Sequence, residues 1–361
     1  RHCSWPWTTG CVMNKKWIKL NTFHHSAFKD IGRLVAEKQG KELTISLCFP
    51  TLNEEKTIAK EIIIMKSELM IRHPLLDEIV VIDSGSTDET RNIASSYGVS
   101  VYEADNILPH LETFKGKGEN LWKALYVTRG DIVVYIDADI KNIHHRFAYG
   151  LLGPLLLTDG IRFTKAFYDR PISVGDNKWR PTGGGRVTEL VTRPLFSLFM
   201  PDLTQILQPL SGEYAGYRNV FESIPFQIGY GVETGMLMDI HEKWGLDVMA
   251  QVDLDRRVHK NQDTKALGRM AFVIIMTFLN RMARQQRIAI RQDLFDEMIQ
   301  YTLVQNQIKS DIRALEQHER PPMKEIPEYR EKFGLKRKAG RGSKHNENKK
   351  RLSVEKGNVS T

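Results

Sequence analysis

The sequence is poor in cysteine and contains no long uninterrupted apolar run. Cys3, Cys11 and Cys48 match neither a disulfide framework nor a zinc motif, and Cys48 lies inside an apolar stretch as a small buried residue would. The longest apolar run, 270–279, is too short to cross a bilayer, and the N-terminus lacks the apolar core of a secretion signal. A Walker-type spacing is also absent, which argues against a P-loop ATPase. These absences predict a cytoplasmic protein without a membrane span.

Both ends of the chain stand apart from its globular composition. The sequence begins at Arg1, and Met13 could be the natural start, so residues 1–12 carry no weight for the fold. Basic residues crowd among Gly, Ser and Asn near the C-terminus and supply much of the formal net charge of +8. Such a run predicts a disordered basic tail over 321–361. Because it lacks interleaved aromatic residues, a nucleic-acid partner is the less favoured alternative.

Strand and helix patterns alternate through the first half of the chain. Strand-like apolar runs alternate with helical periodicity, the strands at 43–49, 78–82, 99–103 and 132–136 and the helices at 53–72, 89–97 and 119–128. This alternation predicts parallel βαβ units in an α/β fold, a three-layer α/β/α sandwich with a mostly parallel central sheet. Ligands in such folds gather at the carboxyl ends of the strands, so the loops after residues 49, 82 and 136 are expected side by side.

The second half shows a weaker pattern. Glycine becomes frequent between residues 153 and 235, and helical periodicity returns at 265–284. Six apolar residues then follow one helical face, which predicts a C-terminal helical extension over 288–320: Leu294, Met298, Tyr301, Ile308, Ile312 and Leu315. This stripe is expected to pack on the domain or on a second subunit.

Asp137 and Asp139 stand where a predicted buried strand ends. Strand side chains alternate faces, so the two carboxylates point the same way, with Ala138 between them. Paired oxygen ligands at a strand end suit a hard divalent cation such as Mg²⁺ or Mn²⁺. The alternative is that these acids only cap the segment that follows.

Two glycine-containing segments are candidate anion sites. Lys115-Gly-Lys-Gly118 precedes a predicted helix, whose N-terminus favours anions, although an exposed basic turn is the alternative. In Gly183-Gly-Gly-Arg-Val-Thr188, backbone N–H groups can approach a ligand closely, and Arg186 and Thr188 add a guanidinium and a hydroxyl. A hinge would also use glycines, but the neighbouring Arg and Thr favour a site for a small acidic molecule.

Arg257, His259 and Asn261 alternate along an expected strand and therefore share one face. Imidazole nitrogen serves Mn²⁺-type sites, so His259 could complete a metal shell, whereas a lone histidine is otherwise an ordinary surface or core residue.

Several motifs resemble known glycosyltransferases. Those at 49–55, 82–88 and 137–139 resemble the nucleotide-sugar half of the GT-A glycosyltransferases. Four more specific motifs resemble the glucosyl-3-phosphoglycerate synthase family of retaining enzymes: Gly116-Lys-Gly-Glu-Asn-Leu-Trp122, Gly183-Gly-Gly-Arg-Val-Thr-Glu189, Gln208-Pro-Leu-Ser-Gly-Glu-Tyr214 and Gly229-Tyr-Gly-Val-Glu233. The resemblance runs from about residue 44 to 284. It implies a GT-A Rossmann-like fold with a nucleotide-sugar half at 41–140 and an acceptor half at 141–287, preceded by a segment at 1–40.

The same resemblance implies the role of each matching residue. The donor, UDP-glucose, would contact Pro50, Thr51, Leu52, Glu54, Ser84, Lys117, Asp137, Ala138, Tyr230, Glu233 and Arg257. The acceptor, 3-phosphoglycerate, would be bound by Gly185, Arg186, Thr188 and Asn261, and Mg²⁺ or Mn²⁺ by Asp139 and His259. Glu233, Lys117 and Arg257 would be catalytic, Glu233 orienting the glucose and Arg257 stabilising the departing diphosphate. The chain has Ala138 where the family often has Ser, and Thr51 replaces a smaller residue. The family's dimers imply a homodimer.

The implied reaction moves glucose to the 2-hydroxyl of D-3-phosphoglycerate with the α configuration kept. Retaining glycosidases use a close pair of carboxylates, one as nucleophile, and no comparable nucleophile is obvious here. Front-face attack is therefore favoured over a covalent intermediate on Glu233. Three alternatives remain: a different donor or acceptor (GDP-glucose, GDP-mannose, another sugar acid or a polyprenyl phosphate), a nucleotidyltransferase that releases pyrophosphate, and a nucleic-acid binder that works through its tail.

Overall fold

The computed structural model describes residues 16–170, 172–173, 179–180, 185–258, 263–315 and 317–335. The chain divides into two compact units, residues 1–323 and residues 324–361. The first unit holds the central sheet and every described residue of the candidate site. In the second, helix α11 (Pro327–Lys332) starts with a proline at its first position, where the missing N–H is no loss. The expectation of little order after residue 320 was therefore wrong for residues 321–335, while 336–361 lie outside the described residues.

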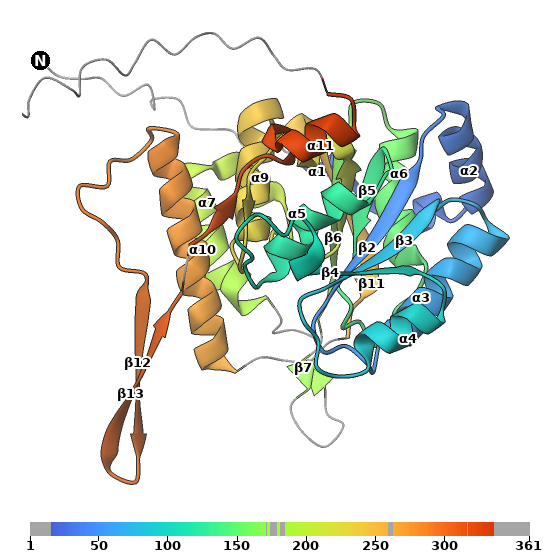
Figure 1. The fold of residues 1–361 in the computed structure, drawn as a ribbon. Helices are drawn as coiled ribbons and strands as arrows, with labels where there is room; N and C mark the ends of the chain where they lie inside the picture. Colours follow the sequence, from blue (N-terminus) through green and yellow to red (C-terminus); the bar gives the residue numbers. More distant parts are fainter. Residues whose placement is uncertain are drawn as a thin grey trace, which may run out of the picture. The chain divides into compact units, whose positions relative to one another are not determined.

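The first unit is built on a twisted eight-stranded sheet (Figure 1). All neighbouring strands are parallel except β9, which runs antiparallel between β5 and β6. This confirms the expected mostly parallel α/β sheet. In spatial order the strands are β1 (Thr22–His24), β11 (Met249–Arg256), β6 (Phe163–Asp169), β9 (Tyr214–Tyr217), β5 (Ile132–Tyr135), β2 (Ile45–Thr51), β3 (Glu78–Asp83) and β4 (Ser100–Glu103).

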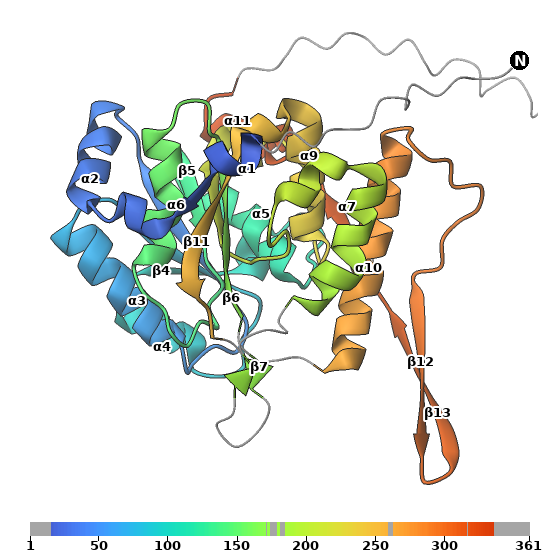
Figure 2. The same cartoon turned by 180° about the vertical axis from the view of Figure 1, so that it is seen from behind.

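Helices cover both faces of this sheet, as Figures 1 and 2 show from opposite sides. One layer contains α2 (Ile31–Gly40), α3 (Ile58–Lys66), α4 (Thr90–Ser96) and α6 (Arg146–Leu157), and the other α5 (Lys117–Val127), α8 (Arg218–Phe221) and α9 (Val232–Trp244). Strand β5 is buried on both sides, since Ile132 and Val134 join the first layer's core while Tyr135 packs on Phe221 in α8. Such burial explains its continuous apolar sequence.

Shorter elements complete the described parts. These are α1 (Lys16–Asn21), α7 (Arg193–Phe199), β7 (Ile172–Ser173), β8 (Trp179–Arg180), β10 (Phe226–Gln227), β14 (Glu319–Arg320), the 3₁₀ segments η1 (His25–Phe28), η3 (Ala104–Asn106), η5 (Pro201–Gln205), η6 (Leu246–Val248) and η7 (Met323–Glu325), and the π-helical turns η2 (Ser67–Arg72) and η4 (Thr188–Thr192).

The helix expected over 53–72 begins only at Ile58, because residues 53–57 form a loop that is tied to the loop after β3. Asn53 adopts a left-handed backbone with φ 58°, and its N–H donates to Ser86 Oγ at 2.8 Å. The Glu54 N–H donates to Thr90 Oγ1 at 2.8 Å. These bonds hold Glu54 at the end of the strands instead of inside a helix.

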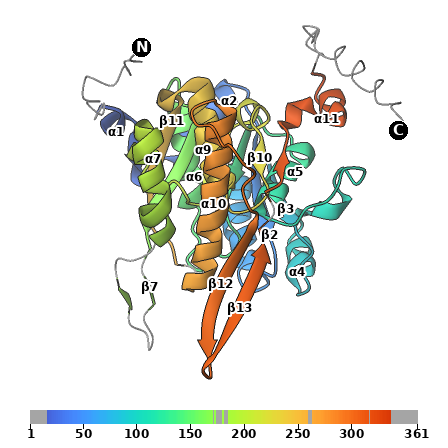
Figure 3. The same cartoon turned by 90° about the vertical axis from the view of Figure 1, so that its left-hand side faces the viewer.

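The helical extension expected over 288–320 is also wrong. Residues 297–314 form an antiparallel hairpin, β12 (Glu297–Val304) and β13 (Gln307–Ala314), beside helix α10 (Thr264–Arg284) (Figure 3). Gln305 and Asn306 both have positive φ, 49° and 61°, which is the two-residue hairpin turn that matches strand twist. The apolar stripe fits a period of 3.6, but Ile299, Tyr301 and Leu303 alternate with a period of 2, and β-branched residues such as Ile299 and Ile312 favour the strand. Strand pairing and the two-residue turn therefore determine the structure here, and the helical spacing of the apolar residues does not.

Helix α10 is the one described helix that is long and apolar enough to cross a membrane by length and composition, with a mean hydropathy of 1.3. It also carries Arg281, which is buried and pairs with Asp239 at 2.8 Å and with Glu319 at 2.5 Å. The helix confirms the periodicity read at 265–284, and the expected absence of a membrane span stays a prediction.

Candidate active site

Three of the residues expected to handle the donor meet at the carboxyl end of the sheet. Asp137 follows β5, Lys117 opens α5 and Glu233 lies in the first turn of α9. Lys117 Nζ lies 2.5 Å from Asp137 Oδ1 and 2.9 Å from Glu233 Oε1. Burial would lower the pKa of Lys117, but Asp137 and Glu233 raise it well above its ordinary value, so the ammonium stays charged. One cation therefore joins three elements that are far apart in sequence.

Arg257, just after β11, bridges the two carboxylates of the Asp137–Asp139 pair. Its Nη2 lies 3.1 Å from Asp137 Oδ2 and 2.6 Å from Asp139 Oδ1, and its Nε lies 3.0 Å from Glu213 Oε1. Burial alone would raise the pKa of Asp137, but the neighbouring Lys117 and Arg257 hold that pKa at about 2. Asp137 is thus ionised at neutral pH and held from both sides by cations.

Close backbone approaches fix these groups in place. A Cβ built on Gly212 would lie 1.9 Å from Asp137 Oδ2, so only glycine leaves room for this carboxylate. A Cβ on Gly118 would lie 1.8 Å from the carbonyl oxygen of Gln227, and the Gly118 N–H donates to the Ile228 carbonyl at 2.7 Å. The motif containing Lys117 is therefore locked against the strand that precedes Glu233.

We expect Gly212→Ala to lower the activity implied by the resemblance at least tenfold, because the new methyl group must displace the Asp137 carboxylate from Lys117 and Arg257. Steady-state kinetics checks this, together with a melting temperature to separate lost activity from lost folding. Gly40→Ala is the matched control, since a Cβ there meets nothing within 4 Å. Equal activity of the two variants would contradict the assigned crowding.

The residues expected at the nucleobase and ribose gather on the ends of β2 and β3. Pro50 and Thr51 are the last residues of β2, and Thr51 Oγ1 donates to Asp83 Oδ1 at 3.1 Å. Ser84 Oγ donates to Asn120 Oδ1 at 2.9 Å, whereas Leu52 is 54% exposed. The structure thus brings this group next to the Asp137–Asp139 pair and leaves an apolar side chain at its rim.

Glu54 and Glu61 add carboxylates to the same end of the sheet. Burial, and then the charge of Asp139, raise the pKa of Glu54 to about 7. Glu61 is buried; its Oε1 accepts the Ile140 N–H at 2.9 Å, while its Oε2 has no hydrogen-bond partner. A crowded set of carboxyl oxygens suits a hard ion such as Mg²⁺ or Mn²⁺, whose charge would favour the ionised form of these acids. The described residues around Asp139 therefore fit the expected metal.

The expected acceptor residues lie partly within the described residues. Gly185 has φ 80°, Arg186 is exposed, and Thr188 is buried at the start of η4. Between them, Val187 packs with Leu210 and with Ile274 of α10, which holds this segment against the chain that leads into Gly212. Tyr230 is half-exposed beside the motif that contains Glu233. His259 and Asn261 lie outside the described residues, so their placement stays a prediction.

Sequence reasoning missed a layer of buried groups behind Arg257. Glu213, on the segment entering β9, accepts a hydrogen bond from Tyr168 at 2.5 Å, and Arg170 Nη2 donates to the Tyr168 hydroxyl at 2.8 Å. Burial raises the pKa of Glu213, against the lowering effect of Arg257. Glu213 belongs to the motif at 208–214, but its role depends on β9 entering the sheet antiparallel, which no local pattern indicates.

Lys165 of β6 is a second missed residue. It is fully buried, donates to the Ser211 carbonyl at 2.8 Å, and lies over the Tyr214 ring at 4.5 Å. Burial lowers its pKa from 10.5 to about 7, with Glu233 acting in the opposite direction. Its apolar neighbours in the sequence gave no sign of a titrating group beside the site.

Lys165 should make the free energy of unfolding rise with pH. Between about 7 and 10.5 the unfolded chain binds the lysine proton and the folded protein does not, so stability increases with pH across that interval. Urea unfolding at several pH values from about 7 to 9 should show this slope in the wild type and a flatter slope in Lys165→Met. The exposed Lys29→Met is the control. Identical slopes in wild type and Lys165→Met would refute the assignment.

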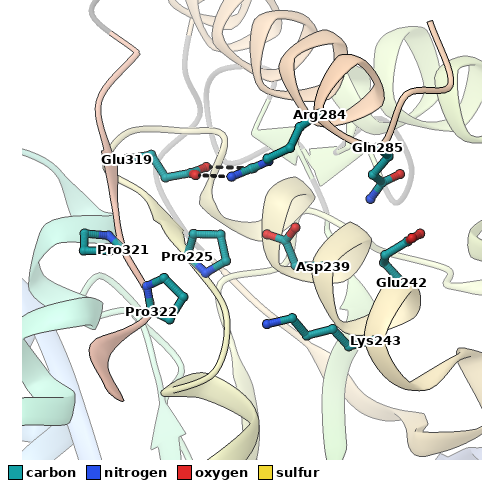
Figure 4. Close-up of a pocket in the computed structure, with 9 residues that line it drawn as sticks. All are labelled: Pro225, Asp239, Glu242, Lys243, Arg284, Gln285, Glu319, Pro321 and Pro322. Carbon is teal, nitrogen blue, oxygen red and sulfur yellow. Dashed lines mark hydrogen bonds and ion pairs between the residues drawn. The ribbon is translucent and has the colours of Figure 1, made fainter. Parts of the chain in front are cut away.

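A separate cavity of about 530 Å³ lies between α9 and the strand β14 (Figure 4). It contains none of the residues expected from the sequence and does not reach the carboxyl ends of the strands. Three prolines form one side of it: Pro225, Pro321 and Pro322. The Arg284–Glu319 ion pair, at 2.7 Å, lies opposite Lys243. The candidate site is therefore the group of residues at the carboxyl ends of the strands, and not this cavity.

Comparison with known proteins agrees with this geometry. The model of the family described as glycosyl transferase family 2 matches residues 46–148. Glucosyl-3-phosphoglycerate synthase from Petrotoga mobilis is 54% identical over 324 residues, which cover 89% of this chain and 98% of that protein.

The chain is also similar to solved structures of glycosyltransferases named for 3-phosphoglycerate. Mannosyl-3-phosphoglycerate synthase from Rubrobacter xylanophilus superposes with a TM-score of 0.79 at 37% identity, covering 86% of this chain and 97% of that one. Glucosyl-3-phosphoglycerate synthase from Mycobacterium tuberculosis, in complex with Mn²⁺, UDP and phosphoglyceric acid, gives a TM-score of 0.74 at 40% identity, covering 85% and 99%. The latter protein has also been solved with Mg²⁺ and UDP.

Proposed function

The chain belongs to the glucosyl-3-phosphoglycerate synthase family, and we propose that its strand-end site moves glucose from UDP-glucose to the 2-hydroxyl of D-3-phosphoglycerate. It is a metal-dependent glycosyltransferase of the GT-A fold, with Mg²⁺ or Mn²⁺ as its cofactor. The observation that carries the proposal is the ion-paired group of Asp137, Asp139, Lys117 and Arg257, which collects both signs of charge at the ends of β5 and β11 and the start of α5.

In this proposal the donor lies along the ends of β2, β3 and β5. Pro50, Thr51, Leu52, Glu54 and Ser84 hold uracil and ribose, and Asp137 and the Ala138 backbone continue the ribose contact. Tyr230 covers the donor from the α9 side. Asp139 and His259 would hold the metal, which neutralises the diphosphate and makes it a better leaving group.

The charged groups around Asp137 then act on the sugar and on the leaving group. Lys117 and Arg257, both held by Asp137, would present their charges to the departing diphosphate, where preorganised charge lowers a barrier. Glu233, held by Lys117 at 2.9 Å, orients the glucose hydroxyls. The departing phosphate oxygen accepts the proton of the acceptor hydroxyl, so no protein nucleophile is required. Trapping a glycosyl adduct on Glu233 would overturn this preference for front-face attack.

The acceptor would be held on the opposite side of the donor. Gly185, Arg186, Thr188 and Asn261 present backbone N–H groups, a guanidinium, a hydroxyl and an amide to the phosphate and carboxylate of D-3-phosphoglycerate. A planar guanidinium suits either oxyanion. Positioning of this hydroxyl against the sugar supplies a further part of the rate enhancement.

A donor panel tests the function directly. The purified chain is incubated with UDP-glucose, GDP-glucose and GDP-mannose, each with 3-phosphoglycerate, and nucleotide release is followed with and without EDTA. We expect release of UDP from UDP-glucose that requires both the acceptor and a divalent ion. Preference for GDP-mannose would assign the activity carried by the Rubrobacter relative's name, and release of pyrophosphate would indicate a nucleotidyltransferase.

We also propose that two copies of the chain associate through the hairpin. One face of the hairpin is apolar and exposed, and we call it the hairpin face. It consists of Ile299, Tyr301, Leu303, Ile308 and Ile312. The other face meets α10, where Arg269 Nη1 donates to Gln300 Oε1 at 3.0 Å. Exposed apolar patches of this kind mark association surfaces, and edge-to-edge or face-to-face pairing of two hairpins is self-complementary.

Light scattering of the purified chain should therefore give the mass of a dimer. Tyr301→Ser with Leu303→Ser should shift it to monomer, since both side chains are about two-thirds exposed, at 67% and 68%. Lys309→Ser, on the opposite face, is the control and should stay dimeric. A wild-type monomer at micromolar concentration would refute the proposal.

A cytoplasmic location belongs to the same proposal. It is supported by the single described free thiol, Cys48, which is buried. Burial raises the pKa of this thiol far above its ordinary value, so it is unreactive. Cell fractionation with an antibody to the chain tests the location.

A further inference from the structure

A cluster of two histidines and one aspartate lies where the N-terminal strand meets β11. His24 ends β1 and His25 opens η1, while Asp255 lies near the end of β11, which pairs with β1 in parallel. His24 Nε2 is 2.9 Å from Asp255 Oδ1, and His25 Nε2 is 2.8 Å from Asp255 Oδ2. The possible ligand atoms of the three residues all lie within 4.8 Å of one another.

The imidazole–carboxylate distances are close to those of a metal shell, and the two histidine ligand atoms lie within 4.8 Å of each other. Ligand atoms about 2.0–2.1 Å from a tetrahedral Zn²⁺ lie roughly 3.3 Å from one another. The imidazole–carboxylate distances of 2.9 and 2.8 Å therefore need to widen by only a few tenths of an ångström. Partly exposed side chains such as His24 and Asp255, each 47% exposed, can make that adjustment.

Each histidine ring also has a partner for its second nitrogen. His24 Nδ1 lies 2.7 Å from Ser26 Oγ, and His25 Nδ1 lies 2.9 Å from the Tyr149 hydroxyl. Metal-bound histidines almost always donate their other N–H to such a group, which fixes the ring and its tautomer. When a cation replaces the proton on each Nε2, the Tyr149 hydroxyl can accept the N–H of His25 Nδ1. Ser26 Oγ can accept that of His24 Nδ1 once the Ser26 backbone N–H, which donates to this nitrogen at 3.3 Å, turns away.

The backbone of Asp255 is unusual in the same place. Its φ is 67°, in the left-handed region, and the register of β11 shifts between Asp253 and Arg256. Asp tolerates this conformation better than most residues, but a bulge with a left-handed residue is typical of positions that aim a side chain. Here it turns the carboxylate toward both imidazoles.

We propose that His24, His25 and Asp255 form a second metal site, for a divalent transition ion of the Zn²⁺ class. Two imidazoles and one carboxylate suit such an ion, whereas Mg²⁺ prefers oxygen ligands alone. The site is separate from the Asp139 site. Arg146, whose Nε lies 3.5 Å from Asp255 Oδ2, weakens cation binding here. A bound ion would join the edge strand β1 to β11 just before Arg257.

The test uses the full chain carrying Asp139→Ala, so that metal binding at the carboxyl ends of the strands is weakened. The protein is freed of metal with a chelator, then equilibrated with Zn²⁺ alone, and bound zinc is counted by mass spectrometry after desalting. We expect one equivalent that disappears when His24→Ala and His25→Ala are added. Zn²⁺ should also raise the melting temperature of the first protein and leave the second unchanged, because an ion that binds only the folded state stabilises it.

Two controls make the result specific. His144→Ala, added to Asp139→Ala, removes an exposed histidine beside the cluster that is not part of it, and should keep the bound zinc. Circular dichroism shows whether the His24→Ala, His25→Ala protein is folded, and His24→Ala alone provides a milder change. Absence of zinc from the Asp139→Ala protein, or zinc that persists without both histidines, would overturn the proposal.

Discussion

Asp139→Ala should lower acceptor-dependent UDP release by roughly 10³-fold or more, since a metal ion contributes several kcal/mol of charge stabilisation and each ~1.4 kcal/mol is tenfold in rate. The carboxylate of Asp139 stands at the end of β5 and is contacted by Arg257 at 2.6 Å, so its loss removes the predicted metal ligand without disturbing the packed core. Initial rates at saturating Mn²⁺ and UDP-glucose measure the effect.

Asp159→Ala is the matched control, because Asp159 is exposed and lies on the turn after α6. It should retain wild-type activity and the same dependence on Mn²⁺. If Asp139→Ala kept more than about a tenth of the activity, less than ~1.4 kcal/mol would come from this carboxylate. The metal would then be held elsewhere.

Arg186→Ala should raise KM for 3-phosphoglycerate roughly 10²-fold, because a charge-assisted hydrogen bond contributes about 1.5–3 kcal/mol. Arg186 is exposed next to Val187, which anchors the loop against Leu210 and α10. The substitution therefore removes the guanidinium while the anchor stays. Affinity for UDP should not change, and calorimetry with UDP and Mn²⁺ measures that quantity separately from the kinetics.

A control variant and the UDP affinity together show whether Arg186 contacts the acceptor or the donor. Arg129→Ala, a substitution of an exposed arginine at the far end of β5, is the control and should leave both constants unchanged. A parallel loss of UDP affinity in Arg186→Ala would place the side chain on the donor instead. An unchanged KM would remove Arg186 from the acceptor site.

The sequence predicts the donor half of the fold well, because its signals are local. Apolar runs bounded by polar loops correspond to β2, β3, β4 and β5 within two residues. Parallel strands bring their carboxyl ends together by geometry, so Asp137, Thr51 and Ser84 could be expected near one another from the order of elements. Lys117 and Arg257 needed the resemblance, since nothing in their spacing shows that each contacts Asp137.

The parts that escaped prediction depend on contacts between distant segments. Glu213 and Lys165 reach the site because β9 inserts antiparallel between β5 and β6, a topology with no local signature. Gly212 belongs to a recognisable motif, but the reason for a glycine there is the carboxylate of Asp137, which comes from a distant part of the chain. A methyl carbon on Gly212 would lie 1.9 Å from that carboxylate. Burial, which sets the lowered pKa of Lys165, is likewise a property of the packed molecule.

The hairpin shows how one pattern can satisfy two periods. Ile299, Tyr301 and Leu303 alternate with the strand period of 2, while Met298 and Tyr301, three residues apart, fit a helical face although in β12 they point to opposite sides. The turn at Gln305–Asn306 lacks the Gly that most often marks such hairpins, which removed the strongest local indication. Only the tertiary structure separates the two interpretations.

The most direct test of the account is the position of Mn²⁺ in crystals of this chain grown with UDP and MnCl₂. Anomalous scattering should place one manganese ion against the Asp139 carboxylate and the UDP diphosphate, with Lys117 and Arg257 close by. A map in which UDP is bound while Asp139 has no metal beside it would contradict the account.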